Sequence, residues 1–371
     1  MERATAKGKD SLNLHDKRLN VLPEEVANLP NCQVLDLSKN NLTELPEKVY
    51  SLNTLTHLDL SRNRFQTLPD ELGKMVSVKH LALQNNVLVS IPTYISEMKT
   101  LNHLNISDNL IAELPMSLLD LKLVKVFECK GNAVTMLPEV EWIVLERINV
   151  MKNFLLCLPA TMSMWVNLKV LNAAENRIGE LPDIGACVNL EEVTLTGNEL
   201  ISLPEGFANC VNLKILHLGR NHLKNDALPL LNGMTKLEEL CLFKNKFSVI
   251  PPEFQEFRQL KQFNISNCEI KKVPSVLGYW AENIEELHFS HNNLVDFPMT
   301  FGACRKLTHL YLGFNPGLQT LPKALAENRN LLMIDLREVA ADFEMPKQLA
   351  NHPRCRFVGI KLKGKGKKKK K

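Results

Sequence analysis

The stretch LTHLDLSRNRFQTLP at residues 55–69 decides the fold. Its apolar, asparagine and proline positions give the unit LxxLxLxxNxLxxLP, which recurs along nearly the whole chain. The asparagine of the unit stands, mostly 23 residues apart, at positions 40, 63, 86, 109, 132, 153, 176, 198, 221, 245, 292 and 315. An apolar residue followed by proline occurs in all fifteen units, which together use 15 of the 19 prolines. This regularity is typical of a solenoid, in which each repeat contacts only its neighbours.

Each recurring residue type has a physical role. The LxL pair, such as Leu58 and Leu60, alternates with polar residues and predicts a short strand with one buried face. The asparagine turns the chain out of the strand, and its amide can satisfy backbone groups of the stacked turn beside it. Proline has no N–H and suits the point where the chain leaves the sheet. Lys17, Cys268 and Val339 fill the asparagine position in three units.

The sequence therefore predicts an α/β solenoid. We expect a leucine-rich repeat horseshoe of about fifteen 23-residue repeats, with parallel strands on the concave face and short irregular or helical segments on the convex face. Four parts are expected: an N-terminal polar segment at residues 1–10, the solenoid at 11–338, a C-terminal cap at 339–361, and a disordered lysine-rich tail at 362–371. Within the cap, residues 346–352 are predicted to form a short helix and residues 356–362 a last strand.

A further apolar column lies three residues before the first leucine of each unit. Cys187, Cys210 and Cys304 stand in this column, where a thiol serves as a small apolar side chain. The cysteines are odd in number, nine in all, and show no paired spacing, which argues against a disulfide framework. We therefore expect free, structural thiols.

The repeat length changes at places where large residues are available to fill space. In the unit that ends at Asn153 the spacing shortens to 21 residues, and Trp142 and Trp165 are predicted to fill the lost volume. Around Trp280 the spacing lengthens to 24 residues. The column position there is the small Ala281, so Trp280 is expected to replace it in the core.

The net charge of +4 comes from one end of the chain. Eight lysines lie within residues 361–371, and without them the net charge of the rest is −4. Three interpretations of this tail stay open: a solvated segment, an anchor on anionic lipid, or a contact with nucleic acid. The N-terminus lacks the pattern of a secretory signal peptide, and no apolar run is long enough to cross a bilayer. We therefore expect a cytoplasmic protein, with the nucleus or the membrane surface as further locations.

The repeat unit also carries a family resemblance. With its period of 23 residues, LxxLxLxxNxLxxLP resembles the unit of the Ras-group intracellular leucine-rich repeat proteins, which include the Shoc-type scaffolds, the Ras suppressor protein and the plant intracellular Ras-group proteins. The resemblance covers residues 11 to about 346. It implies a concave face that binds small GTPases or phosphatase–kinase assemblies. The chain lacks the basic-x-Val-x-Phe docking motif of Shoc-type scaffolds, which puts the phosphatase role in doubt.

Outward-facing strand positions supply the candidate binding residues of the concave face. His57, His80 and His103 share one position in three adjacent repeats and are expected to stack, because neighbouring strands lie about 4.8 Å apart. A metal site is one interpretation of this ladder. A solvated polar column is favoured, because no carboxylate or cysteine completes a tetrahedral set. The other candidates are cationic or aromatic: Arg62, Arg147, Arg220, Phe243, Lys244, His288, Tyr311 and Phe314.

Aromatic residues at these positions are unexpected, since solvent-facing positions of this repeat are normally polar. Phe243, His288, Tyr311 and Phe314 therefore predict a partner-binding hot spot in the C-terminal half. In the alternative interpretation, Phe243 and Phe314 fold down against the edge of the next repeat.

Signatures of catalysis are missing from the sequence. It has no glycine-rich phosphate loop, no nucleophile elbow and no CxxC pair. The sequence favours a monomeric, non-enzymatic scaffold that needs no cofactor and binds a protein partner, with a small GTPase or its regulators as the class implied by the resemblance. The alternative is a peripheral membrane- or RNA-associated factor recruited by weak contacts of the lysine tail.

Overall fold

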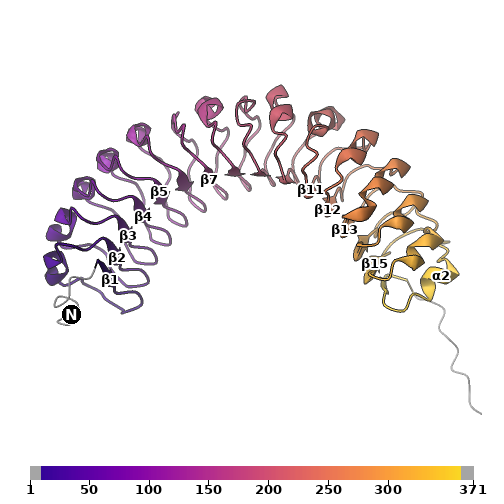
Figure 1. Cartoon of the computed structure of the whole chain (residues 1–371), viewed down its shortest axis with the longest axis horizontal. Helices are drawn as coiled ribbons and strands as arrows, with labels where there is room; N and C mark the ends of the chain where they lie inside the picture. The colour runs from indigo at the N-terminus through magenta and orange to yellow at the C-terminus, as the bar shows by residue number, and fades with distance from the viewer. Residues whose placement is uncertain (1–9, 361–371) are drawn as a thin grey trace, which may run out of the picture. The chain divides into compact units, whose positions relative to one another are not determined.

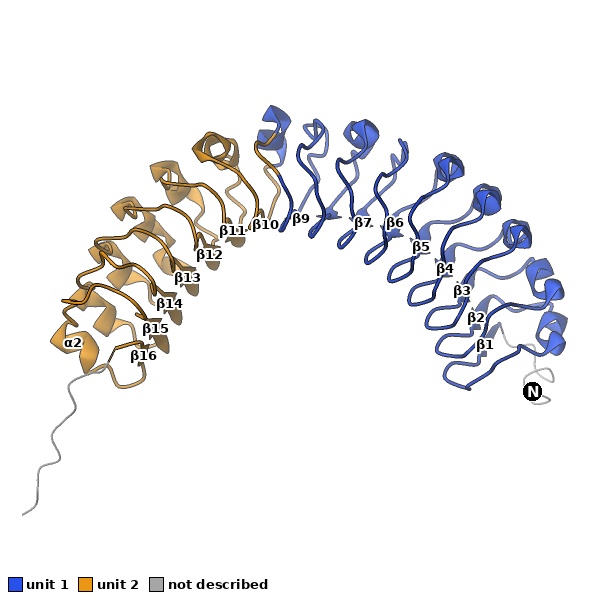
Figure 2. Ribbon diagram, turned by 180° about the vertical axis from the view of Figure 1, so that it is seen from behind, with its two compact units in different colours: residues 1–199, 204–210 blue, residues 200–203, 211–371 orange. Residues whose placement is uncertain are grey.

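Short parallel strands form the framework of the chain. The computed structural model describes residues 10–360. It contains two compact units, one of residues 1–199 and 204–210 and the other of residues 200–203 and 211–371 (Figure 2). In each unit the strands line the inner face of an arc, and the segments that follow the strands form its outer face (Figure 1).

The first unit contains nine three-residue strands that pair in parallel and in sequence order. They are β1 (Ser11–Asn13), β2 (Val34–Asp36), β3 (His57–Asp59), β4 (His80–Ala82), β5 (His103–Asn105), β6 (Val126–Glu128), β7 (Arg147–Asn149), β8 (Val170–Asn172) and β9 (Glu192–Thr194). Its outer segments include the 3-10 helices η1 (Glu24–Asn28), η2 (Glu47–Ser51), η3 (Asp70–Lys74), η4 (Thr93–Glu97), η5 (Met116–Asp120), η6 (Ala160–Met164) and η7 (Glu205–Asn209). Equivalent positions of consecutive repeats lie side by side on neighbouring strands, as Leu35 and Leu58 do.

The second unit repeats this arrangement with seven strands. They are β10 (Ile215–His217), β11 (Glu239–Cys241), β12 (Gln262–Asn264), β13 (Glu286–His288), β14 (His309–Tyr311), β15 (Met333–Asp335) and β16 (Arg356–Val358). The outer helices are η8 (Asn225–Leu231), η9 (Pro252–Glu256), η10 (Ser275–Glu282), η11 (Met299–Ala303), η12 (Lys323–Glu327) and the short α-helix α2 (Lys347–Ala350).

The side-chain pattern explains why these residues form strands and turns. The central leucine of a strand and the leucine two positions later both point inward, as Leu58 (1% exposed) and Leu60 (0%) show. The 3-10 helix of the repeat begins directly after its proline, as η3 does after Pro69. The pyrrolidine ring of proline fixes its backbone φ and replaces the backbone N–H. The loss of this donor costs nothing here, because the chain has already left the sheet.

An asparagine ladder joins consecutive repeats. The amide of Asn63 donates to the carbonyl oxygens of Leu37 at 2.9 Å and Leu60 at 3.0 Å. Its side-chain oxygen accepts a hydrogen bond from the backbone N–H of Leu42 at 3.0 Å. One buried side chain therefore satisfies backbone groups of two repeats, which is the role predicted from the sequence.

The tryptophans fill space where the repeat length changes, as predicted. Trp142 of the short repeat and Trp165 of the following repeat are buried, and the indole N–H of Trp165 donates to the Val140 carbonyl of the short repeat at 2.9 Å. In the long repeat, Trp280 is fully buried while Ala281 is partly exposed. Trp280 therefore occupies the core in place of its neighbour.

The predicted fold class is confirmed: parallel strands line one face and mostly 3-10 turns the other. The described residues form sixteen strands instead of about fifteen, because β16 pairs with β15 beyond the last repeat. Both α2 and β16 lie inside the segment 339–361 that was predicted as a cap. The lysine tail at 362–371, and all but Asp10 of the predicted N-terminal segment at 1–10, lie outside the described residues.

Candidate functional site

The repeat geometry gathers outward-facing side chains into columns on the strand face. The first and third residues of each strand point away from the core, and parallel pairing places the same position of the next repeat beside them. His57 therefore faces His80, which in turn faces His103. A third column follows each strand, at a residue with positive φ that includes Arg62 (54°) and Phe314 (60°).

The three histidines of the first unit stack as a ladder. The ring centroids of His57 and His80 lie 4.3 Å apart with an interplanar angle of 12°, and those of His80 and His103 lie 5.3 Å apart at 36°. Burial lowers the pKa of His80, with further contributions from its two neighbours. Burial likewise lowers the pKa of His103. His80 and His103 are thus held toward their neutral forms.

The histidine rings of the ladder are arranged as a stack and not as the ligands of a metal ion. The almost parallel rings of His57 and His80 present faces to one another, so their nitrogens do not converge on a common point. Within residues 10–360, no group of three or more His, Cys, Asp or Glu side chains is arranged to hold a metal ion.

The two cationic candidates of this unit lie apart from the ladder. Arg62 is exposed in the positive-φ column. Arg147 begins β7 and is exposed, with Val126 between it and His103 in the same column. The structure therefore does not gather the candidates of the first unit into one site.

In the second unit, Phe243 lies flat against the edge of the preceding repeat. Its ring occupies the space that a Cβ atom on Gly219 would need. The side chain is half-buried. It folds down, as in the alternative interpretation, but against the preceding repeat instead of the next one. The neighbouring candidates Arg220 and Lys244 are exposed, at positive φ values of 55° and 53°.

A cluster of stacked rings lies farther along the same unit, on β13, β14 and the turns that follow them. The rings of His288 and Tyr311 stack with centroids 4.2 Å apart and an interplanar angle of 13°. The rings of His291 and Phe314 stack at 4.0 Å and 6°. Together with the charged groups around them, these residues form what we call the aromatic–histidine cluster: Glu286, His288, His291, His309, Tyr311, Phe314, Asp335 and Arg337.

Glu286 organises the polar side of the cluster. Its carboxylate lies 3.2 Å from His288 and 3.8 Å from His309. Burial lowers the pKa of His288, and the hydrogen bond that its ring donates to Glu286 opposes that shift. Burial raises the pKa of the Tyr311 hydroxyl, and the charges of Glu286 and Asp335 add to the effect. The phenol therefore stays protonated and available as a donor.

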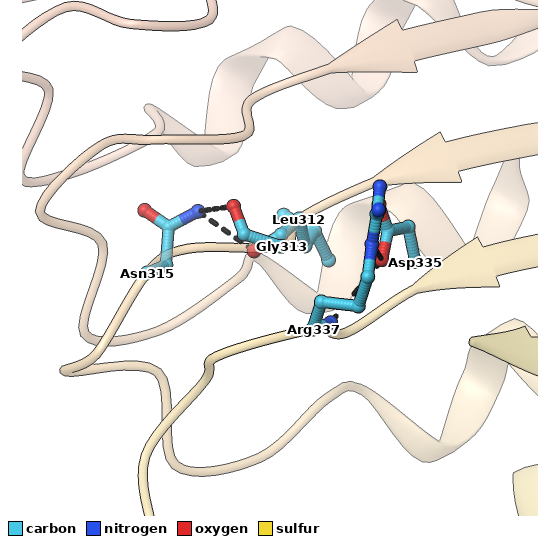
Figure 3. A network of polar contacts seen from close by, with 5 residues as sticks. All are labelled: Leu312, Gly313, Asn315, Asp335 and Arg337. Carbon is cyan, nitrogen blue, oxygen red and sulfur yellow. Dashed lines mark hydrogen bonds and ion pairs between the residues drawn. The ribbon is translucent and has the colours of Figure 1, made fainter. Parts of the chain in front are cut away.

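An ion pair closes the far end of the cluster. Arg337 donates from Nε to Asp335 Oδ1 at 2.9 Å and from a terminal nitrogen to Oδ2 at 2.6 Å (Figure 3). Its guanidinium carbon also lies 5.8 Å from the ring centroid of Phe314. Beside it, Asn315 donates to the Leu312 carbonyl at 2.8 Å and holds the turn in place.

The structure brings together three of the predicted residues, His288, Tyr311 and Phe314, but not Phe243. Strand β12 separates the strand before Phe243 from the strand that carries His288. Sequence reasoning missed five members of the cluster: Glu286, His291, His309, Asp335 and Arg337. Reading the positive-φ column down neighbouring repeats would have found His291, since His291 and Phe314 occupy the same position in successive units.

Comparisons with known proteins agree with this architecture. Residues 11–106 match the family model described as a leucine-rich repeat region. A leucine-rich repeat protein from Leptospira interrogans is 27% identical and superposes with a TM-score of 0.87, over 97% of this chain and 93% of that one. The Arabidopsis receptor kinase HAESA, solved with the peptide hormone IDA and the co-receptor SERK1, is 22% identical with a TM-score of 0.77, over 91% of this chain and 59% of that one.

The curated relatives are larger proteins that share only part of their length with this chain. An adenylate cyclase of Schizosaccharomyces pombe is 28% identical over 38% of this chain and 9% of its own length. Osteomodulin of Rattus norvegicus is 34% identical over 25% of this chain and 22% of its own length. Among the described residues, no helix combines the length and apolar character that crossing a bilayer requires.

Proposed function

We propose that this leucine-rich repeat chain is a non-enzymatic scaffold that binds a protein partner on its strand face. The aromatic–histidine cluster is its main anchor. The observation that carries the proposal is the paired stacking of His288 with Tyr311 and of His291 with Phe314, at 4.2 and 4.0 Å. These side chains are partly exposed, so they remain accessible to a partner while their rings are held in place.

Pre-organised rings are favourable for binding. An aromatic side chain that is already stacked loses little conformational entropy when a partner covers it. Tyrosine and arginine dominate protein-binding hot spots, and the cluster places Tyr311 and Arg337 on consecutive repeats. The hydrogen bond between His288 and Glu286 and the ion pair between Arg337 and Asp335 surround the rings with polar groups, as in the rim of an interface.

Structural neighbours support binding of proteins or peptides in general. The receptor kinase HAESA is described in complex with a peptide hormone, and the plant peptide hormone receptor RGFR1, at a TM-score of 0.68, in complex with RGF2. The finer proposal is a cytoplasmic role in small-GTPase-type signalling. It rests on the repeat unit alone, through its resemblance to the Ras-group proteins.

The test begins with the identity of the partner. Affinity purification on the full chain with mass spectrometry would identify it, and calorimetry with the purified partner would give the dissociation constant. Tyr311→Ala with Phe314→Ala should weaken binding about thirtyfold, the usual effect of truncating an anchor. Tyr279→Ala with Met299→Ala is the matched control, because these side chains are 61% and 76% exposed on the outer helices of the same unit.

Equal affinity of the wild type and the cluster variant, with the outer pair weakening binding instead, would overturn the strand-face proposal. The alternative function, recruitment by the lysine tail, makes a different prediction. Deletion of residues 362–371 would then abolish association with anionic vesicles or RNA and leave the cluster variant unaffected.

A further inference from the structure

A second surface lies outside the strand face, on the flank where the chain leaves the strands of the first unit. Aliphatic and aromatic side chains are exposed there, at positions one, three or four residues after the ladder asparagine. Their exposed fractions run from 44% at Val87 to 66% at Met136. We call this set the apolar flank: Val87, Val89, Leu110, Met136, Phe154 and Leu156.

These side chains are neighbours because the repeats stack at this point as well. The backbone N–H of Leu110 donates to the Leu88 carbonyl at 2.9 Å, and that of Phe154 donates to the Val134 carbonyl at 2.9 Å. Repeats joined in this way lie about 4.8 Å apart where the strands pair. The flank is therefore one continuous surface across the repeats that carry Val87 to Leu156.

No core requirement explains why these positions are apolar. The inward-facing residue between them, Leu88 or Leu155, already fills the core and is fully buried. The position directly after the ladder asparagine, apolar at Val87 and Phe154, holds Arg64 in the repeat before the flank and Arg177 in the repeat after it. Contiguous exposed apolar patches on soluble proteins mark interaction sites when they exceed what a surface normally carries.

Each end of the flank carries an arginine directly after the ladder asparagine, and the Arg177 end also carries the exposed Glu180. Arg64 is exposed, and no ion pair of its guanidinium is found within residues 10–360. Arg177 lies over the ring of Phe154, with its guanidinium carbon 4.9 Å from the ring centroid. Glu113, also exposed, lies at the edge of the flank between these two ends.

These charges argue against a second copy of the chain as the partner that covers the apolar flank. In a symmetric dimer, the flank of the second copy would run either parallel or antiparallel to the flank of the first. The first case sets Arg64 against Arg64, and the second sets Arg64 against Arg177. Either arrangement brings like charges together beside an apolar contact, which is costly.

We propose that the apolar flank is a docking surface for an amphipathic helix of another protein, with carboxylates near both ends of the helix. Arg64 and Arg177 are five repeats apart in the sequence. At about 4.8 Å per repeat, this separation corresponds to an α-helix of roughly 16 residues. The apolar stripe of such a helix covers the flank, its terminal carboxylates meet the two arginines, and a basic residue near its middle meets Glu113.

A synthetic peptide tests this assignment on the full chain. The probe is a stapled helix of roughly 16 residues with leucine and methionine along one face, a lysine at mid-length and glutamates in both end turns. The comparison peptide has lysines in place of those glutamates. Fluorescence anisotropy should show the glutamate peptide binding at least about tenfold more tightly than the lysine peptide.

Variants locate the binding on the flank. Leu110→Ser with Leu156→Ser removes two side chains that are 60% and 62% exposed, so the fold should be unaffected, as circular dichroism would show. This pair should weaken the glutamate peptide about tenfold or more. The matched control is Leu123→Ser with Ile143→Ser, two aliphatic residues of the same unit that are each 51% exposed outside the flank.

Charge reversal completes the test. Arg64→Glu with Arg177→Glu should exchange the preference, so that the lysine peptide binds better. The proposal fails if neither peptide binds below about 1 mM, if the two bind within about twofold of each other, or if the control pair weakens binding as much as the flank pair. It also fails if sedimentation shows a dimer that Leu110→Ser with Leu156→Ser dissociates.

Discussion

Arg337 binds the carboxylate of Asp335 with two side-chain donors, at 2.9 Å to one oxygen and 2.6 Å to the other. Asp335 is only 3% exposed, whereas Arg337 is open to solvent. Burial alone would raise the pKa of Asp335, but the hydrogen bonds and charge of Arg337 outweigh burial and lower it. A buried carboxylate is thereby kept charged beside the aromatic rings of the cluster.

The first prediction is that Arg337→Gln lowers the free energy of unfolding near neutral pH, because it leaves a buried carboxylate without its charged partner. The folded-state pKa of Asp335 lies below its unfolded value of about 3.9. The contribution of the pair is therefore complete above that value and is lost as the pH falls through the folded-state pKa. Urea unfolding should show wild type and variant converging in acid.

The matched control for this prediction is Arg305→Gln. Arg305 pairs with Glu327 at 3.5 Å, but both side chains are more than half exposed, so the loss should be close to zero. If Arg337→Gln and Arg305→Gln unfold at the same urea concentration near neutral pH, the buried pair does not have the role assigned to it.

The second prediction concerns the asparagine ladder. Asn109 donates to the carbonyls of Leu83 at 3.1 Å and Ile106 at 3.0 Å, and accepts from the N–H of Leu88 at 3.0 Å. Asn109→Ala leaves these buried groups unpaired and should cost about 1–3 kcal/mol in chemical denaturation. Asn53→Ala, at an exposed turn position, should leave the midpoint unchanged. An unchanged midpoint for Asn109→Ala would mean that water satisfies the ladder.

The third prediction is a stabilising change at Cys268, one of the three positions where another residue replaces the ladder asparagine. Cys268 stands in the asparagine position, and its thiol lies 3.7 Å from the carbonyls of Leu242 and Ser266. An amide at this position restores the stronger hydrogen bonds of the neighbouring repeats, so Cys268→Asn should stabilise the chain by about 0.5–1.5 kcal/mol. Cys268→Ser, which has no amide, should not. A less stable Cys268→Asn would mean that this turn is too tightly packed for the larger side chain.

The fourth prediction is a pH dependence of the histidine ladder. The pKa values of His80 and His103 are lowered by burial, so the unfolded chain binds protons more readily than the folded one. Stability from these groups is present above the unfolded pKa of about 6.5 and is lost as the pH falls below it. His80→Gln with His103→Gln should therefore lose less stability than wild type between about pH 7.5 and 5.5. Parallel losses in the two proteins would mean that other groups titrate.

The repeat pattern was sufficient for the local structure, because every unit carries its own strand, turn and core residues. The leucine pair, the asparagine and the proline each act within one repeat or between neighbours, so a one-dimensional pattern specifies them. That Trp280 takes the core position in place of Ala281 was predictable for the same reason. One added residue in this repeat shifts the large side chain into the core. The extra strand β16 was expected only as part of the cap, because it lacks the repeat unit.

The candidate site was predictable only in part. The exposed positions of His288, Tyr311 and Phe314 followed from the repeat, but their pairing partners did not. Phe243 also stands at an outward-facing position, one residue before the positive-φ column, yet its ring lies against Gly219. A ring at this position can lie flat where the preceding repeat has glycine, and the choice depends on contacts between repeats.

The sequence by itself determined the fold, the inward and outward faces of each strand, and the columns in which candidate residues stand. All of these follow from a period of mostly 23 residues and from which side chains avoid water. The tertiary structure alone decided which rings stack, which carboxylate is buried beside which arginine, and that the exposed apolar residues from Val87 to Leu156 form one flank. Those outcomes depend on side-chain rotamers and on the distance between residues about 23 positions apart in the chain, which the repeat pattern does not specify.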